Sequence, residues 1–228
     1  MHGRRKSTRP CIRKKEVVLP AMILADDGSI EVSRLKLGRP MFPFAPGMFL
    51  GAVLALPCIT HVRLQHDTVS VAEVTEAFAV LKTRSETVEL EMCTMRRDCK
   101  QMMALAADLM AAGRVHIFRL RRTFAGAEFA ALLRPEVLHA NLIELDIASS
   151  DSFGDVGAEK LGLAMNGNRT LKFVHIESSF VKTAGRTALG WFARSCPNLA
   201  MCTVDGESVL PVAAVAQPAP AKKVKQEK

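Results

Sequence analysis

The sequence contains no apolar run long enough to cross a bilayer, which takes roughly 18 consecutive residues. Its longest apolar candidate, residues 42–58, is interrupted by Pro43, Pro46, Gly47 and Gly51, and we interpret it as the buried helix of a first repeat. The histidines show no metal-ligand spacing, and the glycines between residues 154 and 167 lack the spacing of a phosphate-binding loop. These absences argue against a membrane partner and predict a protein that is not an enzyme and uses no metal or cofactor.

The six cysteines also lack the pairing of a metal site or a disulfide framework. None lies in a C-x-x-C motif, and the basic start of the chain is not followed by the apolar stretch of a secretory signal. We therefore predict free thiols in a reducing compartment, nuclear or cytoplasmic. Cys93 is the best candidate for a reactive thiol, but Glu89 and Glu91 disfavour its thiolate, so we predict no nucleophilic role.

The net charge of +8 is concentrated at the two ends of the chain. Residues 1–15 carry +7 and residues 217–228 carry +3, which leaves −2 on the remainder. Phosphate binding needs clustered positive charge, so the near-neutral body is not predicted to be a nucleic-acid surface. We expect a disordered basic arm over residues 1–15 and a disordered basic tail over residues 207–228.

The basic arm and tail contain short motifs that allow more than one interpretation. The two clusters of the arm have the form of a nuclear import signal, which implies an importin as partner, or they contact nucleic acid directly. The residues concerned are Arg4, Arg5, Lys6, Arg13, Lys14 and Lys15. Two candidate modification sites accompany them, because Ser7 follows a basic cluster suited to a kinase and Lys225 lies in the short consensus for SUMO attachment.

A hydrophobic pattern of the form L-x-x-L-x-L recurs seven times along the chain. Its copies occupy residues 32–37, 59–64, 87–92, 115–120, 142–147, 171–176 and 199–204. They start 27, 28, 28, 27, 29 and 28 residues apart. A fixed period in this range is typical of a solenoid, in which each unit buries its apolar face against its neighbours. We therefore predict an α/β protein whose repeat domain spans residues 30–206, with about six repeats and a terminal strand.

Each repeat is expected to contain a short strand followed by a helix. Helical apolar spacing predicts helices over residues 71–83, 98–112, 126–140, 155–166 and 183–195. Pro135 should kink the helix that contains it or end its first segment. A turn signal at Asp26-Asp27-Gly28 precedes a strand expected over residues 30–37, and a hairpin within residues 16–29 is expected to cap the first repeat. No helix is expected after the last strand.

Alternation along the strands predicts which side chains line the surface opposite the helices. The central row is Lys36, Arg63, Glu91, Arg119, Asp146, His175 and Thr203, and the row before it is Arg34, His61, Glu89, Ile117, Glu144, Phe173 and Met201. The first two strands would thus be positive and the later ones acidic or apolar, with Arg119 and Arg121 as a basic island. From these rows, the predicted contacts with a protein partner are Lys36, Arg63, Glu91, Arg119, Arg121, Asp146, Phe173 and His175. Reversing the charge of Arg63 and Arg119 is expected to weaken binding without changing the melting temperature.

The repeat resembles the leucine-rich repeat of the ribonuclease-inhibitor-like class. Residues 157–161 and 185–189 open their helices in the way of that class, and the resemblance covers residues 30–206. It implies a horseshoe arc with parallel strands on the concave side and helices on the convex side. The class usually has a buried asparagine after each strand, and this chain departs from it there. The matching residues are Pro40, Asp67, Met95, Thr123, Ser150 and Ser179.

Two shorter segments resemble particular groups of repeat proteins. Residues 168–172 and 176–180 are similar to the repeat domain of tropomodulin and leiomodin, which implies binding to actin filaments. Residues 196–199, Cys-Pro-Asn-Leu, resemble the junction in the repeats of F-box proteins, which implies selection of ubiquitylation substrates.

The leading prediction is a non-enzymatic interaction scaffold or adaptor that binds a protein partner on its concave face. One alternative is a nucleic-acid-associated protein that uses its basic termini. Another is a tropomodulin-like actin-binding protein or a ubiquitin-ligase substrate adaptor.

Overall fold

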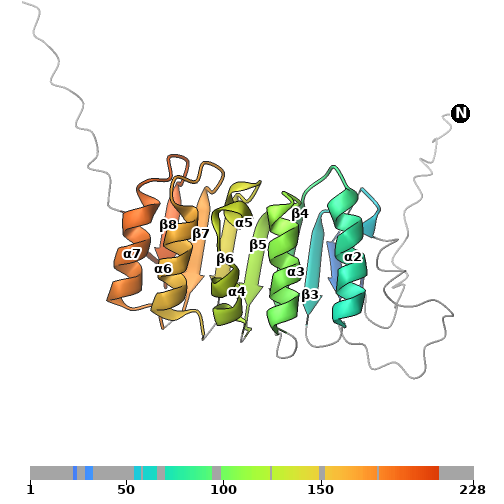
Figure 1. Cartoon of the computed structure of the whole chain (residues 1–228), viewed down its shortest axis with the longest axis horizontal. Coiled ribbons are helices and arrows are strands. Elements are labelled where there is room, and N and C mark those ends of the chain that lie inside the picture. Colours follow the sequence, from blue (N-terminus) through green and yellow to red (C-terminus); the bar gives the residue numbers. More distant parts are fainter. Residues whose placement is uncertain are drawn as a thin grey trace, which may run out of the picture.

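The computed structural model describes residues 23–24, 29–32, 54–57, 59–65, 70–93, 99–123, 125–148, 152–178 and 180–210. Most of the helix expected over residues 42–58 lies outside this part of the chain, as do the basic arm, residues 211–228 of the tail and the candidate residues in both. The remainder forms one sheet with helices along it (Figure 1). No helix in the described ranges is long and apolar enough to span a membrane.

In the described residues, nine strands form a single sheet in which the spatial order equals the chain order. The strands are β1 (Ile23–Leu24), β2 (Ser29–Val32), β3 (His61–Gln65), β4 (Val88–Cys93), β5 (Val115–Arg121), β6 (Glu144–Ala148), β7 (Phe173–Glu177), β8 (Met201–Val204) and β9 (Glu207–Ser208). Strands β2 to β8 pair in parallel, while β1 and β9 add antiparallel edges. Parallel neighbours need a crossover between them, and helices provide most of these. The predicted α/β class is therefore confirmed.

The crossover helices all lie on one side of the sheet (Figure 1). They are α2 (Val71–Thr83), α3 (Cys99–Ala111), α4 (Gly126–Leu132), α5 (Pro135–His139), α6 (Gly154–Met165) and α7 (Thr183–Ala193). Helix α2 begins at a capping box, since the Ser70 hydroxyl accepts from the Glu73 N–H and the Glu73 carboxylate accepts from the Ser70 N–H. Pro135 ends the helix predicted over residues 126–140 at Leu132 and starts α5, because its ring prevents an uninterrupted helix.

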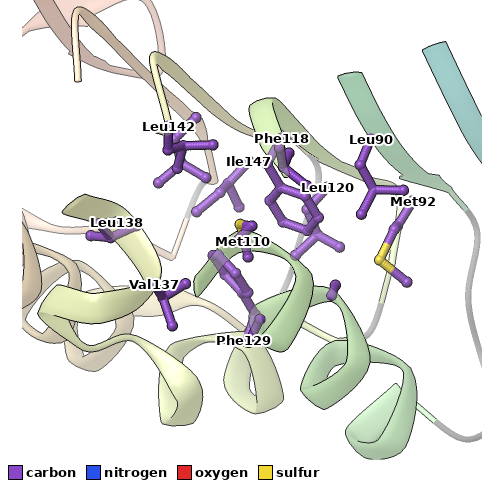
Figure 2. Packing of buried hydrophobic residues seen from close by; sticks show 14 of the residues in the cluster. Leu90, Met92, Met110, Phe118, Leu120, Phe129, Val137, Leu138, Leu142 and Ile147 are labelled. Carbon is purple, nitrogen blue, oxygen red and sulfur yellow. The ribbon is translucent and has the colours of Figure 1, made fainter. Parts of the chain in front are cut away.

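The repeated apolar positions form the core between sheet and helices. Leu90, Phe118 and Ile147 point from successive strands towards Met110 and Phe129 of the helices (Figure 2). All five side chains are buried, and the rings of Phe118 and Phe129 lie 5.2 Å apart. Complete burial of one such side chain contributes roughly 1.5–3 kcal/mol. The period of the sequence thus appears in space as a continuous apolar layer.

A ladder of polar side chains joins successive turns between helix and strand. Each side chain donates to a backbone carbonyl 28–32 residues earlier in the chain. The pairs are Arg84 to Leu54, Arg114 to Lys82, Asn141 to Gly113, Asn168 to Leu138 and Asn198 to Arg169. Sequence reasoning sought a ladder after the strands, where Thr123 is the one described position, and overlooked this ladder before them. It satisfies carbonyl groups that helix ends and turns leave without a backbone partner.

The first parallel strand, β2, pairs with β3 in a register different from the predicted one. The sequence places Lys36 beside Arg63, whereas the Cα partner of Arg63 in β2 is Glu31. Strands β2 and β3 are therefore offset by 32 residues instead of 27. Lys36 itself lies outside the described residues. The misassignment arose because the apolar pair Ile30 and Val32 also fits the repeat pattern and lies directly after the hairpin turn.

The last strand is followed by a short hairpin instead of the predicted tail. Strand β9 pairs antiparallel with β8, although residues 207–228 were all assigned to the basic tail. Asp205 and Gly206 form the turn with φ angles of 52° and 80°, a left-handed conformation that glycine and aspartate tolerate well. The hairpin covers the edge of β8, which would otherwise expose unpaired backbone groups.

Candidate partner-binding face

The side of the sheet opposite the helices is covered by no other element in the described ranges, and we call it the open face (Figure 1). From β3 onward, the pairing register of the strands places the residues of the predicted central row side by side. Its members are Arg63, Glu91, Arg119, Asp146, His175 and Thr203, each the Cα partner of the next. The row before it is also as predicted, with His61, Glu89, Ile117, Glu144, Phe173 and Met201. The open face divides into an N-terminal and a C-terminal half.

In the N-terminal half, Arg119 lies between two carboxylates. Its Nη1 donates to Glu89 Oε2 at 2.9 Å and its Nη2 donates to Glu144 Oε1 at 3.0 Å. The three side chains come from β5, β4 and β6, so the arginine joins three adjacent strands. The side chain of Arg119 is 21% exposed, which reduces screening of both interactions by solvent.

Glu91 is the centre of a second group of charges. Its carboxylate lies 3.6 Å from Arg63 Nε and 3.9 Å from Arg121 Nε, and Arg121 also donates to Asp146. The His61 ring lies 3.6 Å from Glu91 and 3.3 Å from Glu89. The hydrogen bond with His61, together with the nearby arginines, lowers the pKa of Glu91 to about 2 although burial opposes the shift. The same hydrogen bond raises the pKa of His61 above its ordinary value.

These contacts correct the predicted charge pattern of the open face. Arg119 and Arg121 are not a basic island, because Glu89, Glu144 and Asp146 neutralise them. Charges of opposite sign alternate along Arg63, Glu91, Arg119 and Asp146, so each lies opposite a complementary neighbour. The alternation of charge follows from the sequence once the rows are aligned. Only the side-chain geometry shows that the opposite charges lie close enough to form ion pairs.

Cys93 lies beside this group and is a poor nucleophile. Its side chain is buried, and its Sγ lies 3.0 Å from Glu91 Oε1. Burial, followed by the hydrogen bond to Glu91, raises the pKa of the Cys93 thiol to about 11. The thiol therefore stays protonated near neutral pH, which is unfavourable for nucleophilic attack.

The C-terminal half of the open face is apolar and aromatic along β7 and β8. Phe173 and Met201 are Cα partners, and Met201 is 43% exposed. The ring of Phe173 is stacked on that of His175 with 6.5 Å between centroids and 7° between planes. His175 Nδ1 lies 3.1 Å from Thr203 Oγ1, which fixes the orientation of the imidazole. In this part of the face, Phe173 and His175 are therefore held in place, while the apolar surface of Met201 is still open to solvent.

Next to this apolar surface lies a shallow depression of about 520 Å³, which we call the acidic depression. Its lining comprises Asp146, His175, Ile176, Glu177, Thr203, Asp205 and Gly206. Asp205 accepts from the Ser178 N–H at 2.8 Å and from Arg186 at 2.8 Å, so the turn before β9 is held in place. Glu177 is exposed, and its side chain makes no hydrogen bond or ion pair with any described residue.

No group of three or more potential metal ligands occurs in the described ranges. Of the residues predicted from the sequence, Lys36, Ser7, Lys225 and the six basic residues of the arm lie outside those ranges. The structure brings Arg63, Glu91, Arg119, Arg121 and Asp146 into two groups of ion pairs, which His61 joins through Glu89 and Glu91 and which together we call the ionic network. It places Phe173 and His175 in the separate apolar half. Sequence reasoning missed Glu177 as a site residue, although it lies two positions after His175 on the same side of β7.

Comparisons with family models, with curated proteins and with solved structures find no match to this chain. The sheet and its helices define the chain as an α/β protein in which, among the described residues, one face of the sheet is covered by helices and the other is open.

Proposed function

We propose that the chain is a leucine-rich-repeat solenoid that binds a protein partner on its open face and has no enzymatic activity. The strands stack in chain order with helices on one side, and polar side chains join turns 28–32 residues apart. Both features support a repeat architecture in which each unit contacts its neighbours. In such a solenoid the open face is the concave one.

The contrast between the two halves of the open face carries the proposal. Ion pairs within the chain engage the charged side chains of β3 to β6, whereas β7 and β8 present the partly exposed Phe173, the exposed Met201 and Glu177, whose carboxylate has no described cationic partner. Apolar side chains of a partner would remove Phe173 and Met201 from water, which is favourable. We therefore assign partner contact to β7 and β8, with Asp146 of β6 at their border, and a structural role to the ionic network of β3–β6.

A rigid sheet suits this function because little of it must be ordered on association. Both Phe173 and His175 are held by stacking and by the contact of His175 with Thr203. The non-enzymatic part of the proposal is supported by Cys93, whose thiol is disfavoured as a nucleophile. We place the protein in the nucleus or cytoplasm, since none of the four described cysteines forms a disulfide in the described ranges.

Site-specific photocross-linking in cells tests the proposal. A photoreactive residue at Thr203 on the open face is compared with one at Leu163 on α6, which is 54% exposed on the opposite side. We expect position 203 to cross-link a specific protein that position 163 does not. The purified partner should then bind the wild-type chain and lose affinity for the double variant Phe173→Ala and Met201→Ala. The absence of any cross-link specific to position 203 would refute the function.

The positive charge at the ends of the chain favours one second candidate, nucleic-acid association through the termini. Deleting residues 1–15 separates the two candidates. If salt-sensitive retention on RNA is lost while partner binding persists, the ends bind nucleic acid independently of the open face.

A further inference from the structure

The open face has an excess of negative charge although the whole chain is basic. Among the described residues from β3 to the turn at Asp205, the open face carries three arginines and six carboxylates, a balance of three negative charges when histidine is neutral. These residues are Arg63, Arg119, Arg121, Glu89, Glu91, Glu144, Asp146, Glu177 and Asp205. The sign of this part of the face is therefore opposite to that of the chain.

The excess is concentrated in the acidic depression. All three arginines lie on β3 and β5 and pair with carboxylates of β4 and β6. Asp205 shares Arg186 with Glu207, and Asp146 shares Arg121 with Glu91. Glu177 has no cationic partner in the described ranges, and it lies on the same wall of the depression as His175. A cation from another molecule would thus meet carboxylates whose charge is only partly compensated.

We propose that the partner presents a basic side chain, arginine or lysine, to Glu177 and Asp146 in the acidic depression. An apolar side chain of the partner next to it would lie on Phe173 and Met201. This inference rests on the proposed function and names the chemistry of the partner surface. Charge complementarity selects this occupant, because the same carboxylates repel a phosphate backbone or an acidic peptide.

The dimensions and neighbours of the depression suit an arginine especially well. Its walls place Asp146, Glu177 and Asp205 around one space, and a guanidinium has five N–H donors that can serve several carboxylates at once. The stacked rings of Phe173 and His175 provide an apolar surface for the aliphatic part of the side chain. Lysine carries the same charge but has no fork of donors, so it should bind more weakly.

An array of fluorescent octapeptides tests the inference on the full chain. Each peptide carries one leucine and one arginine at a varied separation, and matched peptides replace the arginine by lysine, citrulline or glutamate. Fluorescence anisotropy should show saturable binding of the arginine series, weaker binding of lysine and none of citrulline or glutamate. Affinity should fall as salt rises, since the interaction is exposed.

Two variants with the same charge change locate the binding. Glu177→Lys should weaken the best peptide about fivefold or more. Glu159→Lys on the exposed side of α6 should leave the affinity unchanged, and both variants should melt as the wild type does. Equal effects of the two substitutions would show that general charge, not the depression, attracts the peptide, and would overturn the inference.

The remaining outcomes separate this inference from the proposed function. If Thr203 cross-links a partner but no arginine peptide binds, the chemistry assigned to the partner is wrong while the docking face stands. If replacing the four lysines of residues 217–228 by glutamine tightens peptide binding, the chain's own tail occupies the depression, and the choice of another protein as occupant is overturned. Glu177-dependent binding of an RNA oligonucleotide would overturn it as well.

Discussion

Replacing Arg119 by alanine should destabilise the fold without acting on a partner directly. The substitution removes two charge-assisted hydrogen bonds, at 2.9 and 3.0 Å, and leaves Glu89 and Glu144 without their shared cation. A hydrogen bond to a charged group contributes about 1.5–3 kcal/mol. Because the Arg119 side chain is 21% exposed, we take a value below the sum and expect a loss of about 2 kcal/mol.

Urea denaturation followed by far-ultraviolet circular dichroism measures this loss. The same change should lower the melting temperature by about 4–8 °C in a chain of this size. Arg194→Ala is the matched control, because Arg194 is exposed at the end of α7 and forms no ion pair with a described residue. A double-mutant cycle with Glu144→Gln should give a coupling energy of about 1 kcal/mol.

A loss for Arg119→Ala as small as that of Arg194→Ala would show that the network is too well solvated to matter, and the division of the open face would fail. The same reasoning bears on the reversal of Arg63 and Arg119 together. From the sequence alone we expected an unchanged melting temperature for that double variant. The ion pairs with Glu91, Glu89 and Glu144 lead us to expect a lower one, so reduced partner binding by that variant could not be ascribed to lost contacts.

Three further predictions concern single side chains. His61→Gln should cost more stability at about pH 5.5 than at about pH 8.5, because the raised pKa of His61 stabilises the fold below the unfolded value of 6.5 and this contribution is lost as pH rises through the folded value. Asn168→Ala should cost about 3 kcal/mol, since buried Asn168 donates to one carbonyl and accepts from two backbone N–H groups. Trp191, the single tryptophan, is 70% exposed, so its fluorescence should resemble that of indole in water and be strongly quenched by acrylamide.

Each of these measurements has an outcome that contradicts its reasoning. A stability difference for His61→Gln that does not vary with pH would mean that the imidazole is not engaged by Glu91. For Asn168→Ala the control is Asn166→Ala, at an exposed position two residues earlier, and similar losses for both would refute a role for the ladder. A blue-shifted emission of Trp191 would show that another surface covers the exposed side of α7.

The rows of the open face show which strand neighbours can be predicted from the sequence pattern. Alternation along each strand and a near-constant period were enough to align Arg63 with Glu91 and His175 with Thr203. The same reasoning failed at β2, where two overlapping apolar patterns compete and only pairing with β3 selects Glu31 as the partner of Arg63. It also missed β9, because the two-residue strand has no apolar period to detect.

The apolar period by itself determined the order of strands and helices, since burying residues 27–29 positions apart requires units that stack on one another. It also determined which residues point away from the helices. Tertiary structure alone decided which of those residues are engaged, because ion pairing depends on distances of a few ångströms between side chains on different strands. Arg119 meets Glu89 and Glu144 across that space, whereas Glu177 meets no described cation, and this difference separates the structural half of the face from the half assigned to a partner.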